Sequence, residues 1–204
     1  MNGSRKGSSW EREICKQLSL WWTYGKDEDV FWRTAGSGAR ATVRSKQNKN
    51  TFGQHGDIQA TNPTGQRLID VCCIELKRGY SKETFSSIID KPENAAEQMY
   101  EKFIHQAELS SISAGSQSWL LIVKRDRREA LIFMPYHFMT GLASVDCRVG
   151  IYHPHVSFSM KKNNIVYKIF GMTLNNFLKM VSPTDIKEIY KKNGYYPAVA
   201  RKNK

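Results

Sequence analysis

The chain has 204 residues, of which 40% are hydrophobic and 25% are charged. This length suits one globular domain, and the composition is that of ordinary globular proteins, which excludes disorder or collagen-like repetition for most of the chain. The 31 basic residues outnumber the 19 acidic ones and give a net charge of +12, which favours a polyanionic partner.

Neither a membrane span nor a secretory leader is expected. The apolar run at residues 119–123 is far shorter than the ~20 residues that a bilayer core requires. The first fifteen residues lack the apolar stretch of a signal peptide. The cysteines form no C-x-x-C pair and are expected to be reduced: Cys15, Cys72, Cys73 and Cys147. We therefore expect a cytoplasmic protein, in the host-cell cytoplasm if the source is viral.

Residues 8–23 are expected to form an amphipathic helix. Glu11 falls within its apolar arc on a helical wheel, whereas Arg12 falls on the opposite, polar side. A carboxylate that faces the core is a candidate for an active site. The alternative is that Ser8-x-x-Glu11 forms a capping box at the helix N-terminus. The apolar residues that recur at helical spacing are Trp10, Ile14, Cys15, Leu18, Trp21 and Trp22.

A short strand is expected at residues 29–34, and a basic loop follows at residues 35–56. Loops of this length without secondary structure are uncommon in compact domains unless they are functional or disordered. The segment could be a solvated insert, but the lack of any acidic residue favours contact with DNA phosphates and ordering on binding. Its basic residues are Arg40, Arg44, Lys46 and Lys49.

Two strands at residues 57–61 and 68–77 are expected to form a hairpin, because residues 62–65 read Asn-Pro-Thr-Gly and supply turn chemistry. Glu75 and Lys77 then share one face of the second strand. The hairpin would bring Asp57 near the position opposite Glu75. Charged residues inside a strand of otherwise apolar character are costly unless they are paired or bind a metal.

The sequence from residue 93 onwards predicts further helices and strands. We expect a helix at residues 93–113 and strands at 118–124 and 129–134 joined by the charged connection 125–128. Gln106 is expected at the edge of the helix's apolar face as a boundary residue, with contact to water or substrate as the alternative. Further strands are expected at 149–159 and 165–170, and helices at 173–181 and 183–193. This order predicts an α/β fold with a mixed central β-sheet flanked by helices. Residues 1–134 would form the core and residues 135–204 a basic C-terminal α+β extension.

The two carboxylates and the lysine suit metal-assisted hydrolysis of a phosphodiester. Mg²⁺ prefers hard oxygen ligands and usually takes one or two protein carboxylates together with substrate phosphate oxygens. Asp57 and Glu75 would supply those carboxylates, and Glu11 could complete the site. Lys77 would orient or help to activate a water molecule and offset developing negative charge.

These motifs resemble those of a known superfamily. Asp57 followed by Glu75-Leu76-Lys77 resembles the PD-(D/E)XK nuclease signature. The sequences KGSSWERE at residues 6–13 and RTAGSG at residues 33–38 resemble two elements of archaeal-type Holliday junction resolvases. The match differs in three ways: residues 39–56 separate the second motif from Asp57, His55-Gly56 and not Pro precedes Asp57, and the chain continues beyond residue 134.

The resemblance implies a role for each matching residue and a restriction-endonuclease-like core. Asp57, Glu75 and the Leu76 carbonyl would bind Mg²⁺, for which Mn²⁺ would substitute, and Lys77 would be the catalytic lysine. Glu11 would be an active-site acid that also approaches the metal. The resemblance also implies residues that face the substrate: Arg12, Arg33 and Ser37.

The sequence therefore predicts a Mg²⁺-dependent DNA endonuclease, in the first place a homodimeric enzyme that resolves four-way junctions in DNA recombination or repair. One alternative is a sequence-specific restriction-type or mobile-element endonuclease whose extension reads bases in the major groove. Another is a non-catalytic DNA-binding protein on a nuclease fold. A nucleotide cofactor is not expected, because Gly36-Ser37-Gly38 lacks the Lys-Ser/Thr ending of a P-loop.

Overall fold

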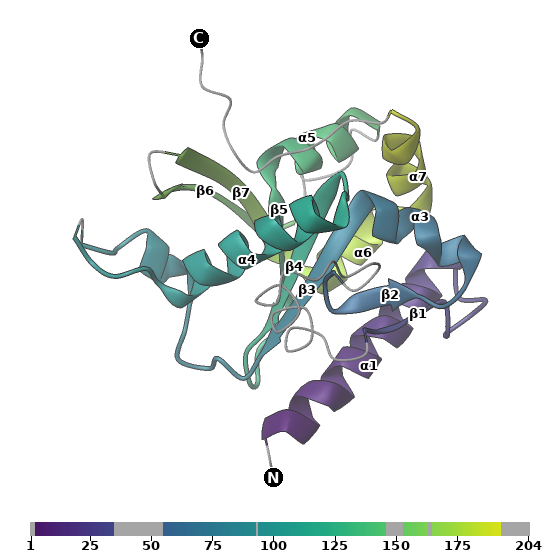
Figure 1. The fold of residues 1–204 in the computed structure, drawn as a ribbon, viewed down its shortest axis with the longest axis horizontal. Helices are drawn as coiled ribbons and strands as arrows, with labels where there is room; N and C mark the ends of the chain where they lie inside the picture. Colours follow the sequence, from purple (N-terminus) through teal and green to yellow (C-terminus); the bar gives the residue numbers. More distant parts are fainter. Residues whose placement is uncertain (1–2, 35–54, 93, 146–152, 163–164, 193–204) are drawn as a thin grey trace.

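The computed structural model describes residues 3–34, 55–92, 94–145, 153–162 and 165–192. Its order of elements confirms an α/β fold (Figure 1). The elements are α1 (Gly3–Trp22), β1 (Phe31–Arg33), β2 (Ile58–Ala60), α3 (Pro63–Val71), β3 (Cys72–Arg78), the 3-10 helix η1 (Phe85–Ile88), α4 (Met99–Ala114), β4 (Ser118–Lys124), β5 (Leu131–Pro135), α5 (Tyr136–Val145), β6 (His155–Lys162), β7 (Ile165–Thr173), α6 (Leu174–Met180) and α7 (Pro183–Lys191).

Five strands form a mixed sheet in the order β3-β4-β5-β7-β6. β3 and β4 are parallel, and every other neighbouring pair is antiparallel. β1 and β2 form a separate antiparallel pair beside the β3 edge. This mixed sheet, flanked by helices, is consistent with a restriction-endonuclease-like core.

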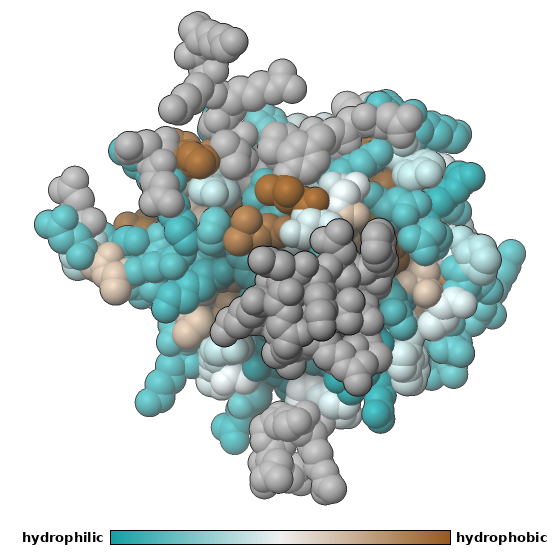
Figure 2. All heavy atoms as spheres, in the orientation of Figure 1, coloured by the Kyte–Doolittle hydropathy of each residue, from teal (hydrophilic) through white to brown (hydrophobic). Residues whose placement is uncertain are grey.

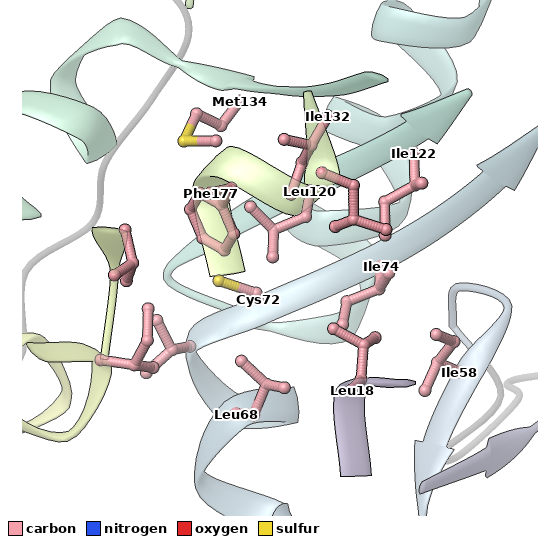
Figure 3. Packing of buried hydrophobic residues seen from close by; sticks show 14 of the residues in the cluster. Leu18, Ile58, Leu68, Cys72, Ile74, Leu120, Ile122, Ile132, Met134 and Phe177 are labelled. Atoms are coloured by element: carbon pink, nitrogen blue, oxygen red, sulfur yellow. The ribbon is translucent and has the colours of Figure 1, made fainter. Parts of the chain in front are cut away.

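The core lies on both faces of the large sheet. Side chains of α1, α3, α5, α6 and α7 pack on one face, where residues such as Leu18, Leu68 and Phe177 converge on Ile74 and Leu120 (Figure 3). α4 covers the other face with a second apolar cluster. On the face drawn in Figure 2, hydrophilic residues cover much of the coloured surface, and a few hydrophobic residues are visible among them.

The predicted helix at residues 8–23 is confirmed, although α1 begins earlier, at Gly3. Its apolar arc is buried as the helical wheel indicates, with Trp10, Ile14 and Leu18 each at most 3% exposed. Ser8 lies inside the helix and not at its N-cap, so the capping-box interpretation of Ser8 and Glu11 is wrong.

The predicted hairpin of residues 57–61 and 68–77 is wrong. Asn62 caps α3 by accepting a hydrogen bond from the Thr64 amide at 2.9 Å, and Pro63 occupies the first turn of that helix. The same residue types favour turns and helix starts, so the local sequence did not separate the two. β2 pairs with β1, and β3 enters the large sheet directly after Val71.

The later elements agree better with expectation. β4 has the predicted bounds, and β4 and β5 form the predicted antiparallel pair. α4 starts at Met99, six residues after the predicted start, and the Glu101 carboxylate accepts a hydrogen bond from the Gln98 amide there at 2.6 Å. α5 was not predicted. β7 pairs with β5, so residues beyond 135 add two strands to the same sheet. Three of the four cysteines, all except Cys147, are described, and all three are free and buried.

Candidate active site

Two charged side chains of β3 lie between the sheet and α4. Alternation along the strand sends Ile74 and Leu76 to the cluster around α1, and Cys73 to the cluster around α4. Glu75 and Lys77 follow Cys73 and contact residues of α4. The Lys77 Nζ lies 3.2 Å from the Glu75 Oε2, and the side chains are only 14% and 4% exposed. Such a buried ion pair is the arrangement that the strand composition predicted.

Asp57 reaches the same place along the β3 edge of the large sheet, without a hairpin. Its amide donates a hydrogen bond to the Ile74 carbonyl at 2.8 Å, and its Oδ2 accepts one from the Leu76 amide at 2.7 Å. The Thr34 amide donates to the Asp57 carbonyl at 2.9 Å. These contacts fix the Asp57 carboxylate beside the backbone of residues 75 and 76.

Gly56 allows this close approach of two backbones. Its φ of +74° is in the left-handed region, and an added Cβ would lie 2.8 Å from the Ile74 oxygen and 2.9 Å from the Cys73 sulfur. Both the backbone conformation and the lack of space therefore require glycine. The residue before Asp57 acts as a spacer that seats the carboxylate on the strand edge.

The electrostatics confirm that the two carboxylates interact. Burial raises the pKa of Glu75, and the charge of Asp57 raises it further, while Lys77 and a hydrogen bond from the Ser110 side chain oppose the rise. Burial also raises the pKa of the Cys73 thiol, with further contributions from Glu75 and Asp57. The site therefore concentrates negative charge in a poorly hydrated place, which is where a cation would bind.

α4 contributes residues that sequence reasoning did not assign to the site. The Gln106 Nε2 donates a hydrogen bond to the Glu75 Oε2 at 3.2 Å. Ser110, one turn further along, also contacts Glu75. The Lys77 ammonium lies 5.8 Å from the centroid of the Phe103 ring. Phe103, Gln106 and Ser110 recur at helical spacing, but only the placement of α4 over β3 shows that this face meets the charged pair.

Glu11 does reach the interior but pairs with Arg33. The Arg33 Nε lies 2.9 Å from the Glu11 Oε2, and the Arg33 Nη1 donates to the Ser8 Oγ at 2.8 Å. Ser8 and Glu11 belong to one of the two sequence motifs at residues 6–13 and 33–38, and Arg33 belongs to the other. The structure therefore joins these motifs, which are far apart along the chain.

The Glu11–Arg33 pair lies near Asp57, because Arg33 pairs in register with Ile58 and the next amide, of Thr34, donates to the Asp57 carbonyl. Burial raises the pKa of the nearby Cys15 thiol to about 12; Glu11 and Asp57 add to the rise, and Arg33 opposes it. Among the described residues, however, no group of three or more His, Cys, Asp or Glu side chains could hold a metal ion. The structure thus brings Asp57 and Glu75 together without adding Glu11 as a third carboxylate.

The predicted DNA-binding residues are only partly described. Arg12 is exposed on α1, and Arg33 is half-buried. The remaining predicted contacts lie outside the described residues: Ser37, Arg40, Arg44, Lys46 and Lys49. No helix in the described part of the chain is both long enough and apolar enough to span a membrane.

The donor set fits a hard divalent cation. Asp57 and Glu75 offer carboxylate oxygens, and the Leu76 carbonyl belongs to the residue that directly follows Glu75, whose amide donates to Asp57. Two carboxylates and a backbone carbonyl are few ligands, as is usual where substrate and water oxygens complete the coordination of Mg²⁺. The mutual repulsion of the two carboxylates also gives the protein a reason to bind a cation there.

Comparison with known proteins agrees with this geometry. A family model described as "Phage putative PDDEXK endonuclease" matches residues 2–188. No curated protein matches the chain, and no solved structure does. The matched range includes β2, β3 and α4, which supply the candidate site.

Proposed function

We propose that this chain, which belongs to the family described as "Phage putative PDDEXK endonuclease", hydrolyses phosphodiester bonds of DNA in a reaction that depends on Mg²⁺. The observation that carries this proposal is the convergence of Asp57, Glu75 and Lys77 at one edge of the sheet. If Glu75 and Lys77 formed only a structural ion pair, Asp57 would have no role beside them, because its negative charge disfavours the charged form of Glu75.

Asp57, Glu75 and the Leu76 carbonyl would hold the cation. When bound, such a cation polarises the scissile phosphodiester and lowers the pKa of a water molecule. The chain itself supplies positioning, because Asp57 is fixed by the Leu76 amide and Glu75 is fixed by Gln106 and Lys77. A metal-ligand role for Glu11 stays a prediction, as does the substitution of Mn²⁺ for Mg²⁺.

Lys77 would act on the reacting groups. Its ammonium is held between the Glu75 carboxylate and the Phe103 ring, which limits the positions that it can take. From there it would orient the attacking water and offset the negative charge that develops on the phosphate. Its side chain stays 14% exposed, so the ammonium is within reach of a substrate.

A four-way junction is the proposed substrate, and a homodimer the proposed active form. Support comes from the motifs that resemble junction resolvases, because Arg33 of one motif contacts both Ser8 and Glu11 of the other and pairs in register with Ile58, the residue after Asp57. Resolution of a junction needs two symmetric cuts, which a two-fold symmetric dimer would supply. Action in the cytoplasm of a host cell stays a prediction.

One assay tests the activity and the substrate together. A four-way junction, a linear duplex of the same sequence and a single strand are incubated with the protein in Mg²⁺ or in a chelator. We expect cleavage of the junction in Mg²⁺ only. Lys77→Ala should reduce the cleavage rate by about 10²- to 10⁴-fold while DNA binding is kept.

The matched control is Lys91→Ala. Lys91 also pairs with a buried glutamate, Glu101, at 2.8 Å, but it lies in the connection between η1 and α4, and Glu101 is in the first turn of α4. This variant should cut DNA like the wild type. Equal cleavage by the Lys77→Ala and wild-type proteins would show that the site is misplaced. Cutting of linear duplex at one sequence would favour a restriction-type or mobile-element enzyme, and salt-sensitive binding without turnover would favour a non-catalytic DNA-binding protein.

A further inference from the structure

We infer that the DNA backbone beside the scissile bond is held by a basic rim at the C-terminal ends of β3 and β4. This inference rests on the proposed function and deepens it by naming where the duplex would lie. The basic rim consists of Arg78, Lys82, Lys124, Arg125, Arg127 and Arg128.

The sheet topology places the basic rim next to the candidate site. β3 and β4 are parallel, so Lys77 pairs with Val123 and Arg78 with Lys124 in register. The Gly79 amide lies 3.4 Å from the Lys124 carbonyl. The strands that carry Lys77 and Lys124 therefore end together, and the β4–β5 connection turns beside the C-terminal end of β3, next to Lys77 (Figure 1).

The two connections that form the basic rim are fastened to each other. The Ser81 hydroxyl, after β3, donates a hydrogen bond to the Asp126 carboxylate of the β4–β5 connection at 3.2 Å. Within the β4–β5 connection, the Arg128 amide donates to the Arg125 carbonyl at 3.3 Å. Arg127 has a φ of 59°, a conformation that glycine or asparagine adopts at lower cost. The conformation of the turn therefore does not explain an arginine at position 127, and its side chain is exposed.

Most charged side chains of the basic rim have no ion-pair partner, whereas several lysines elsewhere on the described surface do. Lys16, Lys91, Lys162 and Lys191 each form an ion pair with a glutamate. Within the described part of the chain, Lys82, Lys124, Arg125, Arg127 and Arg128 form no ion pair. Lys82, Arg127 and Arg128 are also exposed. Their charges are available to phosphates.

An exposed aromatic residue lies between the basic rim and the catalytic lysine. The Tyr80 ring meets the Phe103 ring edge-on at a centroid distance of 4.8 Å, and the Phe103 ring also contacts Lys77. Tyr80 is 37% exposed. It offers a flat surface to a sugar or a base just beyond the scissile bond. A duplex bound at Lys77 would thus pass Tyr80 and continue across the basic rim.

The test measures DNA binding in a chelator, where cleavage does not interfere. The probes are a synthetic four-way junction and a linear duplex of the same sequence. Each phosphate contact that is lost should lower the slope of log K against log salt by about 1 and weaken binding of all sequences alike. For Arg127→Ala/Arg128→Ala we expect affinity to fall about tenfold or more and the slope to decrease by between about 1 and 2.

The matched control is Lys161→Ala/Lys168→Ala, which removes the same charge from the exposed face of β6 and β7, at the other edge of the sheet. It should bind DNA with nearly the wild-type salt slope. Lys82→Ala, on the second connection, should weaken binding in the same direction as the rim double variant. A loss that is equal in the control, or absent from both rim variants, would overturn the inference. Rim-dependent binding without any cleavage would instead overturn the proposed function alone.

Discussion

The Glu75 carboxylate is buried beside the Asp57 carboxylate, whose negative charge disfavours ionisation of Glu75 in the metal-free protein. Its pKa is raised by burial and by Asp57, so the folded state holds the proton more tightly than the unfolded chain does. The stability that this proton supplies is present at low pH. It is lost as pH rises through the raised pKa, above the range in which a glutamate ordinarily ionises.

Glu75→Gln should therefore raise the melting temperature of the metal-free protein, because the amide keeps the shape of the protonated side chain without a buried charge. We expect the difference from wild type to be largest at pH 8 and to shrink towards pH 5. Added Mg²⁺ should raise the melting temperature of the wild type and have much less effect on the variant. Thermal unfolding at both pH values, with and without Mg²⁺, measures these effects.

Glu129→Gln is the control for that substitution, since Glu129 is exposed at the end of the β4–β5 connection. It should leave the melting temperature nearly unchanged at either pH. A lower melting temperature for Glu75→Gln at pH 8 would mean that its hydrogen bonds to Lys77 and Gln106 outweigh the burial of its charge.

Gly56→Ala should destabilise the protein and impair cleavage together. The new methyl group would meet the Ile74 oxygen and the Cys73 sulfur at 2.8 and 2.9 Å, and the positive φ adds backbone strain. The expected loss is about 1–3 kcal/mol of unfolding free energy, measured by urea denaturation. Cleavage should fall because Asp57 is the next residue.

Gly25→Ala separates the effect of backbone strain from the effect of the close contact with residues 73 and 74. Gly25 has a similar φ of +83°, but nothing lies within 4 Å of its added Cβ. The Gly25→Ala variant should lose only the part of the unfolding free energy that comes from backbone strain at a positive φ. It should cleave DNA like the wild type. If both alanine variants lost the same stability, the close approach at Gly56 would have no energetic consequence.

At the scale of elements, the sequence predicted best where one local pattern had one structural meaning. The apolar arc of α1 and the strands β4 and β5 follow directly from periodicity. Asn62 and Pro63 were ambiguous, because they favour both turns and helix starts. The convergence of Asp57 and Glu75 was predicted correctly but through the wrong contact, since β2 pairs with β1 and Asp57 bonds to the edge of β3. Gln106 and Ser110 could not be assigned to the site, because their role depends on tertiary packing.

The cap of α3 gives an element-scale prediction. Asn62 accepts a hydrogen bond from the Thr64 amide, and α3 runs directly into β3, the strand of Glu75. Asn62→Ala should lower the free energy of unfolding by about 1 kcal/mol, as measured in urea. Asn94→Ala, at an exposed asparagine outside any helix, should change it by less than about 0.5 kcal/mol. Equal effects would show that the cap adds nothing to stability.

At the scale of the whole molecule, the segments before and after residue 134 share one core. β7 lies between β5 and β6, and Phe170, Phe177 and Ile186 are buried in the same cluster as residues of α1 and β3. The Trp21 indole of α1 donates a hydrogen bond to the Val181 carbonyl at 2.9 Å. The family match, at residues 2–188, also extends across this position.

A fragment that ends at Met134 should therefore fail to fold cooperatively, although it contains Asp57, Glu75 and Lys77. Without β7, the outer edge of β5 loses its hydrogen-bond partner, and the α1 face of the sheet loses the side chains of α5, α6 and α7 that cover it. We expect no unfolding transition in urea and no Mg²⁺-dependent cleavage. A chain that ends at Lys192 keeps every described core residue and should unfold and cut DNA like the full chain. A cooperative transition in the shorter fragment would instead make residues 135–204 an extension on an independent nuclease core, as the sequence alone predicts.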